Sequence, residues 1–324
     1  MMHPLLIGVA CLPLLFRLVP MIVPEHYLEP YAYWNAGTLN EQDGKIETYW
    51  RNMGYWDGID SYSEAAGTLA RKLLEFADAE PGGAILDIAH GAGESLSMHL
   101  NSSRPPSHLD ALTSLPSESR FAKDLIAHRH PNMETVTNFF TSSASYRPGK
   151  DLQHPLNPMR GFMGDRRPSD EGLEPLAPPY HLVYILDAIY HFRPSTAHFL
   201  SHVIHVLKPS GVIAFTDILP PSNLSPFLGH LILPPLLSVP ARNLVSKTRT
   251  VEGYHELMQK IGYKNVKIED WSDHVFPGLA NHLRSRGRLW TLVAKGIEWA
   301  ERGGWKFVAV RASRSAVDHR LSQD

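Results

Sequence analysis

Short apolar runs alternate with helical patterns along most of the chain. Seven runs have the length and composition of β-strands, at 84–88, 109–112, 136–140, 181–186, 212–215, 264–270 and 305–311. Helical patterns fall between them, over 63–79, 94–100, 118–128, 195–207, 250–261 and 275–302. Strands that alternate with helices are typical of an α/β fold with a mainly parallel sheet. We therefore expect a Rossmann-like, doubly wound sheet of seven strands.

A glycine turn follows the first predicted strand. Gly91-Ala92-Gly93 links that strand to the helix predicted over 94–100. Such a turn directs backbone N–H groups to one spot beside a helix N-terminus, and glycine lets a ligand approach the backbone closely. The spacing Asp87-x-x-x-Gly91-x-Gly93 lacks the third glycine of the dinucleotide fingerprint. This turn is the principal candidate for a ligand site.

The composition narrows the class of protein. The 324 residues suit one large domain with insertions or two small ones, and a hydrophobic content of 43% allows a packed core. A formal net charge of −2 gives no electrostatic argument for nucleic acid. The single cysteine, Cys11, excludes an internal disulfide framework and a cysteine-based zinc site. The 18 histidines show no metal-ligand spacing, so we expect no metal.

Three stretches together resemble the class I S-adenosylmethionine-dependent methyltransferases. Asp87-x-x-x-Gly91-x-Gly93 is similar to their first motif, and YHLVYILDAIYHF at 180–192 to their fourth. The run HVLKPSGVIAFTD at 205–217 matches the helix, turn and strand that follow the fourth motif. The resemblance covers about residues 45–270, and the general look of the chain is that of fungal members of the superfamily.

This resemblance implies a fold, a cofactor and a set of binding residues. The last strand should insert antiparallel beside the sixth, and the cofactor should be S-adenosyl-L-methionine. The first-motif turn would hold its methionine end. In the position where the family usually has a ribose-binding acid, this chain has Thr113 and Ser114. The implied cofactor contacts are Asp87, Ala89, His90, Gly91, Gly93, Thr113, Ser114 and Asp187.

An aromatic segment precedes the turn, between residues 27 and 60. Its stretch from Tyr49 to Trp56 resembles the entry segment, ending in Gly-Tyr-Trp, of tocopherol-, cyclopropane-fatty-acid- and sterol-type methyltransferases. The electron-rich faces of Tyr49, Tyr55 and Trp56 suit a sulfonium cation. The alternative interpretation is a cap packed on the core, because aromatic side chains bury much area.

Polar residues after the fourth-motif strand are the catalytic candidates. Methyl transfer from a sulfonium mainly needs the nucleophile to be positioned, and a general base helps when that nucleophile is a hydroxyl. His191 is the candidate base, because imidazole titrates near neutrality, and Tyr190 and His90 are reserves. A histidine hydrogen-bonded for structural reasons is the competing interpretation of His191.

Apolar segments flank the predicted domain. Residues 5–23 are long enough to span a bilayer, but Pro13, Arg17 and Pro20 interrupt them, so a membrane-surface anchor or a segment packed on the domain is favoured. The proline-broken stretch 219–245 indicates either a lid for a lipophilic substrate or membrane surface, or a packed insertion. We expect a cytoplasmic location, with contact to an intracellular membrane through residues 5–23. Pairing into a homodimer is compatible with these features.

The expected organisation is a cap over 1–60, a domain over 61–312 and a disordered tail over 313–324. Insertions are expected at 141–179 and 219–249. Within the first insertion, Gly164-Asp165 resembles the pair that meets the adenine amine in the family, but it is displaced along the chain, and a solvated charge is the favoured interpretation.

The sequence thus predicts a methyltransferase acting on a lipophilic small molecule, in secondary metabolism or lipid-like chemistry. A non-catalytic regulator that keeps the fold and binds a protein partner is the main alternative. A nicotinamide oxidoreductase is disfavoured, since the third glycine and a ribose-binding acid after the second strand are both missing.

Overall fold

The structure is a computed structural model that describes residues 36–160, 180–233, 237–245 and 250–315. The segment 5–23 and the pair Gly164-Asp165 lie outside the described residues. The strands are β1 (Glu41–Gln42), β2 (Lys45–Ile46), β3 (Ala84–Ile88), β4 (His108–Thr113), β5 (Val136–Thr141), β6 (Tyr180–Ile185), β7 (Leu207–Leu219), β8 (Tyr263–Asp270) and β9 (Lys306–Arg314). The helices are α2 (Ala36–Asn40), α3 (Tyr62–Ala77), α4 (Glu94–Leu100), α5 (Pro116–Arg129), η2 (Ile189–His191), α6 (Thr196–Val203), η3 (Leu228–Ile232), α8 (Ala241–Val245), α9 (Val251–Ile261), α10 (Ser272–Ser285) and α11 (Arg288–Arg302).

Seven strands form one sheet in the order β5-β4-β3-β6-β7-β9-β8. The pairs from β5 to β7 are parallel, whereas β9 pairs antiparallel with both β7 and β8. The predicted doubly wound, seven-stranded sheet with an antiparallel last strand is therefore confirmed. From β3 the parallel strands continue through β4 to β5 on one side, and from β6 to β7 on the other. The strand order therefore reverses between β3 and β6, and ligands of open α/β sheets bind at such a point.

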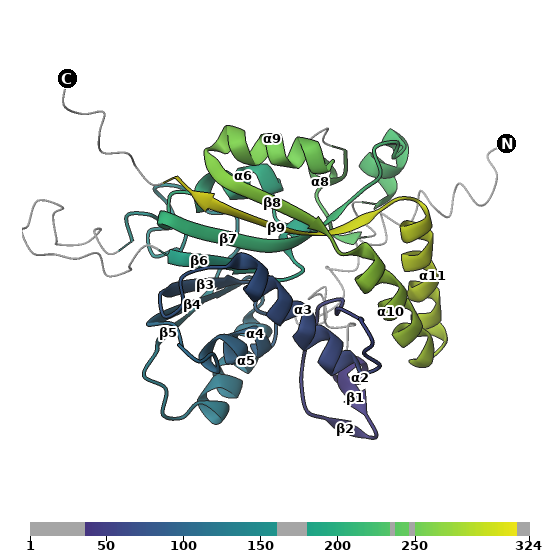
Figure 1. The fold of residues 1–324 in the computed structure, drawn as a ribbon, viewed down its shortest axis with the longest axis horizontal. Coiled ribbons are helices and arrows are strands. Elements are labelled where there is room, and N and C mark those ends of the chain that lie inside the picture. Colours follow the sequence, from purple (N-terminus) through teal and green to yellow (C-terminus); the bar gives the residue numbers. More distant parts are fainter. Residues whose placement is uncertain (1–35, 161–179, 234–236, 246–249, 316–324) are drawn as a thin grey trace, which may run out of the picture.

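Helices cover both faces of the sheet (Figure 1). On one face, α4 and α5 bury Leu96, Leu100 and Ala122 against β4, while α3 and α10 cover the middle strands. On the other face, α6 and α9 contribute Phe199, Leu200 and Met258 to the largest cluster of buried side chains. Both helices begin at hydroxyl caps, Ser195 and Thr250, and α9 ends at Gly262 with a φ of 113°.

Two boundaries differ from the sequence prediction. The single helix expected over 275–302 is instead two helices, α10 and α11, because Gly287 adopts a φ of 114° between them. The helix expected over 195–207 ends at Val203, since Leu207 already pairs with Tyr180 at the start of β7. Ser313 and Arg314, which were expected in the tail, belong to β9.

The first part of the 141–179 insertion is tied to the sheet by a buried charge. Arg160 forms an ion pair with Asp110, which also accepts hydrogen bonds from Tyr180 and Asn138. Burial alone would raise the pKa of Asp110, but these partners and His108 outweigh it and bring the pKa to about 2. Residues 146–156 thereby pack on the α6 face of the sheet, where Tyr146 and Leu156 join the core.

Among the described residues, no helix has both the length and the apolar composition needed to cross a bilayer.

Candidate functional site

The turn after β3 contains three residues in the left-handed region. Ala89, Gly91 and Gly93 have φ values of 62°, 55° and 97°. A Cβ on Gly93 would lie 2.9 Å from Cβ of Ala122, so glycine is required here for α4 to approach α5. A Cβ on Gly91 would meet only Cδ of Arg51, at 3.8 Å, so space remains above this part of the backbone. The amide of Ala89 donates to the carbonyl oxygen of Leu112 at 2.7 Å, which fixes the turn beside the end of β4.

Asp87 lies beneath this turn as a buried carboxylate. It is 1% exposed, and neither of its oxygens has a hydrogen-bond partner among the described residues. Nε2 of His99, on α4, is 3.5 Å from Oδ2 and is itself outside hydrogen-bond geometry. A buried carboxylate without hydrogen bonds is costly, so this position is suited to a cationic ligand.

His90 occupies the centre of the turn. Its Nδ1 donates to the carbonyl oxygen of Gly91 at 2.9 Å, and its ring meets Phe139 edge-on. Burial lowers the pKa of His90 despite the nearby charge of Asp87, which favours the neutral ring. The side chain therefore stiffens the turn and adds no positive charge to it.

Asp187, Tyr190 and His191 gather just after β6. The hydroxyl of Tyr190 donates to Oδ1 of Asp187 at 2.8 Å, and the amide of Asp187 donates to Oγ1 of Thr216 on β7. Burial raises the pKa of Asp187 to about 6, against the lowering effect of the hydrogen bonds from Tyr190 and Met53. Asp187 therefore lies close to its titration midpoint just below neutral pH.

His191 is oriented by a backbone contact. Its Nδ1 lies 3.2 Å from the carbonyl oxygen of Ser238, so Nδ1 carries the proton and Nε2 of the neutral ring does not. Burial lowers the pKa of His191, which favours the neutral ring. The imidazole thus has the protonation that a general base needs, and its ring packs on Tyr190 at a centroid distance of 4.4 Å.

The end of β4 has hydroxyls in place of a carboxylate. Thr113 is buried, and its Oγ1 accepts a hydrogen bond from the amide of Leu115, while Ser114 is exposed. A carboxylate stands a little further on, at Glu118 in the first turn of α5. It forms an ion pair with Arg51 at 2.6 Å, and Arg51 is the side chain nearest to the open side of Gly91.

Three acidic side chains at this edge of the sheet bind residues 47–53, which we call the entry segment. Besides the Arg51–Glu118 pair, the amide of Tyr49 donates to Glu94 at 2.9 Å, and the amide of Met53 donates to Asp187 at 2.8 Å. Glu94 also holds Arg129, which reaches back to the carbonyl oxygen of Glu47. The ring of Tyr49 packs edge-on against Phe121 of α5.

Tyr55 and Trp56, predicted as cofactor-facing aromatics, lie in the packing between α3 and α10. Tyr55 is 7% exposed, stacks on His274 at 4.6 Å and has Nζ of Lys72 over its ring. Trp56 packs on Tyr62 and His282, and its Nε1 donates to the carbonyl oxygen of Met53. The structure thus gives these two rings the role of a cap, because their faces are occupied by protein.

Four side chains of this edge were not predicted from the sequence: Arg51, Glu94, His99 and Glu118. Glu94, His99 and Glu118 lie in predicted helices and Arg51 lies in the aromatic segment. The partners of Arg51, Glu94 and Glu118 are distant along the chain. Only Glu94, directly after the glycine turn at the start of a helix, had a local signal. Within the described ranges, no group of three His, Cys, Asp or Glu side chains is arranged to hold a metal ion.

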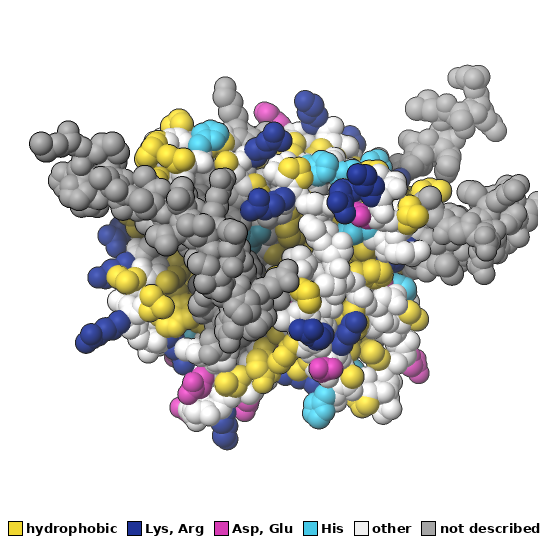
Figure 2. Space-filling view, turned by 180° about the vertical axis from the view of Figure 1, so that it is seen from behind, with side chains coloured by type: hydrophobic (Ala, Val, Ile, Leu, Met, Phe, Trp, Pro, Cys, Tyr) yellow, Lys and Arg dark blue, Asp and Glu magenta, His cyan; other side chains and the backbone are white. Residues whose placement is uncertain are grey.

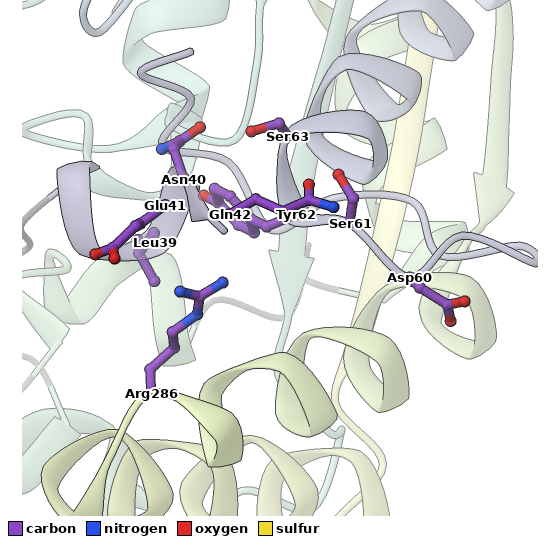
Figure 3. A pocket seen from close by; sticks show the side chains of 9 residues that line it. All are labelled: Leu39, Asn40, Glu41, Gln42, Asp60, Ser61, Tyr62, Ser63 and Arg286. Carbon is purple, nitrogen blue, oxygen red and sulfur yellow. The ribbon is translucent and has the colours of Figure 1, made fainter. Parts of the chain in front are cut away.

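A separate small pocket of about 100 Å³ lies between the N-terminus of α3, the α2–β1 region and the α10–α11 junction (Figure 3). Arg286 extends from that junction toward Leu39 and Glu41. Its walls include Asp60 and Glu41 as well as Arg286, and none of the predicted site residues lines it. We therefore place the candidate site at the glycine turn and not in this pocket.

Comparison with known proteins found one curated relative and many similar folds, while no family model matches the chain. The chain is 27% identical over 244 residues to erythromycin 3''-O-methyltransferase of Saccharopolyspora erythraea, covering 73% of this chain and 69% of that protein.

The similar solved structures share the fold at low identity. A geranyl diphosphate C-methyltransferase from Streptomyces coelicolor, solved with S-adenosyl-L-homocysteine, has a TM-score of 0.61 at 15% identity and covers 89% of this chain and 98% of its own. A cyclopropane synthase from Mycobacterium tuberculosis has a TM-score of 0.59 at 12% identity, with coverages of 86% and 93%. The [4+2]-cyclase SpnF has a TM-score of 0.57 at 16% identity, with coverages of 82% and 87%.

Proposed function

Because this chain has the class I S-adenosylmethionine-dependent methyltransferase fold, we propose that it transfers a methyl group from S-adenosyl-L-methionine. The proposed acceptor is a hydroxyl of a lipophilic small molecule. The cofactor agrees with the solved neighbours, several of which contain S-adenosylmethionine or S-adenosylhomocysteine. The curated relative is named as an O-methyltransferase, which supports oxygen as the accepting atom.

The observation that carries this proposal is the buried carboxylate of Asp87 beneath the glycine turn. A carboxylate that accepts no hydrogen bond from the described residues fits a ligand with an ammonium group and a sulfonium. The open side of Gly91 lets such a ligand approach the backbone. The residues present therefore fit the cofactor at its methionine end.

Binding of the ribose requires a different arrangement from the one usual in the family. Thr113 offers a hydroxyl that is already engaged by the backbone, so it is a weak partner for a diol. Glu118 presents a carboxylate whose position is fixed by Arg51. We assign Glu118 to the ribose side of the cofactor, because charged acceptors form the stronger hydrogen bonds to hydroxyls.

The bound cofactor supplies a methyl group that is already activated by the sulfonium sulfur. His191 holds an unprotonated Nε2 and is the group that takes the proton of the accepting hydroxyl. Asp187 and Tyr190, which are hydrogen-bonded at 2.8 Å, are the polar side chains next to it. The main contribution of the chain is to orient the acceptor, which can be worth roughly 7–11 kcal/mol at best.

The segment after β7 supports an acceptor with a large apolar part, from secondary metabolism or lipid-like chemistry. Tyr190, Leu224 and Leu228 all pack on the apolar cluster that contains Leu244, and Tyr190 contacts the ring of His191, the proposed base. Such a lining favours a lipophilic molecule over a polar metabolite.

Calorimetry with S-adenosylhomocysteine tests the cofactor site. We expect saturable binding, and we expect Gly91→Ala to weaken it at least about tenfold because the new methyl group takes the open side of the turn. Gly149→Ala is the matched control, since Gly149 also has a positive φ and open surroundings. Equal affinity of the two variants would contradict the assignment.

Incubation with S-adenosylmethionine and a metabolite extract then tests turnover. Release of S-adenosylhomocysteine above that of the same extract without the protein supports the enzyme, whereas cofactor binding without added release supports the non-catalytic regulator. Replacement of the family's ribose acid by Thr113 is the feature that keeps this second function open.

A further inference from the structure

Helix α11 has apolar side chains on two sides. Trp290, Val293 and Ile297 pack against α10 and form the inner side of the helix. Leu289, Leu292 and Trp299 are 73%, 64% and 56% exposed. Their spacing places them along one stripe of the outer side, and Gly296 continues it. Large apolar side chains that line up in this way are unusual on a solvated surface and mark a contact site.

Basic residues follow the same stripe along one edge. Arg288, Lys295 and Arg302 are seven residues apart, so they form a line parallel to the apolar stripe, and all three are exposed. Arg302 pairs with Glu298 of the same helix at 3.2 Å, so Arg288 and Lys295 carry the positive charge of this line. Basic and hydrophobic side chains indeed stand side by side along the edge of the molecule that α11 occupies (Figure 2). The whole chain has a formal net charge of −2, so this positive line is a local feature.

The exposed apolar surface continues onto the segment around η3. Phe227 and Leu231 are 59% and 56% exposed. Their neighbours Leu224 and Leu228 pack in the same cluster as Ala300 of α11, so the two elements adjoin. Tyr190 belongs to this cluster as well, and the surface therefore borders the candidate site.

The charge pattern decides between two occupants of this surface. If a second copy docked through antiparallel α11 helices, the basic line of each copy would face that of the other, which is repulsive. A helix with leucine and tryptophan on one side and basic residues along its edge instead fits anionic lipid headgroups above acyl chains. We propose that α11 and η3 form a docking surface for an anionic membrane.

Membrane docking through this surface does not depend on the reaction proposed above. Leu289, Leu292 and Phe227 would enter the apolar boundary of the bilayer, while Arg288 and Lys295 meet the headgroups. Docking in this orientation brings the cluster around Tyr190 to the membrane, where a lipophilic acceptor dissolves.

Co-sedimentation of the full chain with phosphatidylcholine vesicles, with and without phosphatidylserine, tests the proposal. We expect binding to the phosphatidylserine vesicles that weakens with added salt, and little binding to phosphatidylcholine alone. The double variant Leu289→Ser, Leu292→Ser should bind at least about tenfold more weakly. The control Met133→Ser, Val136→Ser removes two exposed apolar side chains at the other end of the sheet and should bind like the parent.

A second variant separates charge from apolar contact. Arg288→Gln, Lys295→Gln should remove most of the preference for phosphatidylserine without changing the melting temperature. Unchanged vesicle binding of the leucine variant would overturn the proposal, because another segment would then carry the binding. So would a dimer in light scattering that the leucine variant converts to a monomer, since the stripe would then join two copies.

Discussion

The backbone amide of Met53 donates a hydrogen bond of 2.8 Å to Oδ2 of Asp187, joining the entry segment to the end of β6. Tyr190 holds the other oxygen of the same carboxylate. Both contacts favour the ionised acid, yet burial and the charge of Asp217 keep the pKa of Asp187 at about 6. The entry segment is thus tied to a group that changes its charge near physiological pH.

The raised pKa predicts how Asp187→Asn changes stability with pH. A carboxyl whose pKa is higher in the folded state stabilises the fold below its unfolded value, and this contribution is lost as pH rises through about 6. As the pH rises from about 4 to about 7, the parent should lose about 2 kcal/mol of unfolding free energy relative to Asp187→Asn.

Urea unfolding followed by circular dichroism across that range measures the difference. Asp124→Asn, on the exposed side of α5, is the matched control for the loss of one carboxyl group. If the difference in unfolding free energy between Asp187→Asn and the parent does not change with pH, the pKa of Asp187 is not raised in the folded state.

The ion pair of Arg51 and Glu118 predicts a loss of cofactor affinity. Glu118→Gln keeps the size of the side chain and removes its charge, so S-adenosylhomocysteine should bind about tenfold more weakly. Glu80→Gln is the matched control, because Glu80 also forms a 2.6 Å pair, with Lys208, but on the exposed surface. Calorimetry that finds Glu118→Gln equal to the parent would remove Glu118 from the site.

The role of His191 predicts a rate effect without a binding effect. His191→Gln should lower kcat about 100-fold on a hydroxyl acceptor and leave S-adenosylhomocysteine affinity unchanged. Because burial lowers the pKa of His191, the parent rate should fall only on the acid side of the usual histidine range, and the variant should lack this fall.

The pH–rate profile of both proteins measures this difference, with His205→Gln as an exposed histidine control. An acid limb that survives in His191→Gln would assign the base to another group.

The positions of the strands and the glycine turn could be predicted because their signals are local, whereas the antiparallel last strand followed only from the family resemblance. The run from Ala84 to Ile88 and the two glycines lie within a dozen residues, and hydrophobic runs of this length have few alternatives in an α/β chain. The caps Thr250 and Gly262 were equally readable, since each acts on its own helix end. The break at Gly287 was missed, although the stretch from Arg284 to Arg288 contains no apolar side chain.

The partners of the site could not be predicted, because they depend on tertiary contacts. Nothing in the sequence around Arg51 indicates that Glu118 lies opposite it, or that Glu94 accepts from Tyr49. The aromatic segment shows the same limit. Its composition is compatible with a cofactor wall or a cap, and only the packing of Tyr55 on His274 distinguishes them.

Because three acidic side chains bind residues 47–53, the candidate site depends on a segment that precedes the seven-stranded sheet. A protein shortened to start at residue 61 would keep every strand from β3 to β9, but Glu94, Glu118 and Asp187 would each lose a donor that now neutralises or solvates it. Glu94 would keep Arg129 and Asp187 would keep Tyr190, but Glu118 would lose the ion pair with Arg51. Shortened variants and fragment screens should for this reason retain the residues that precede α3.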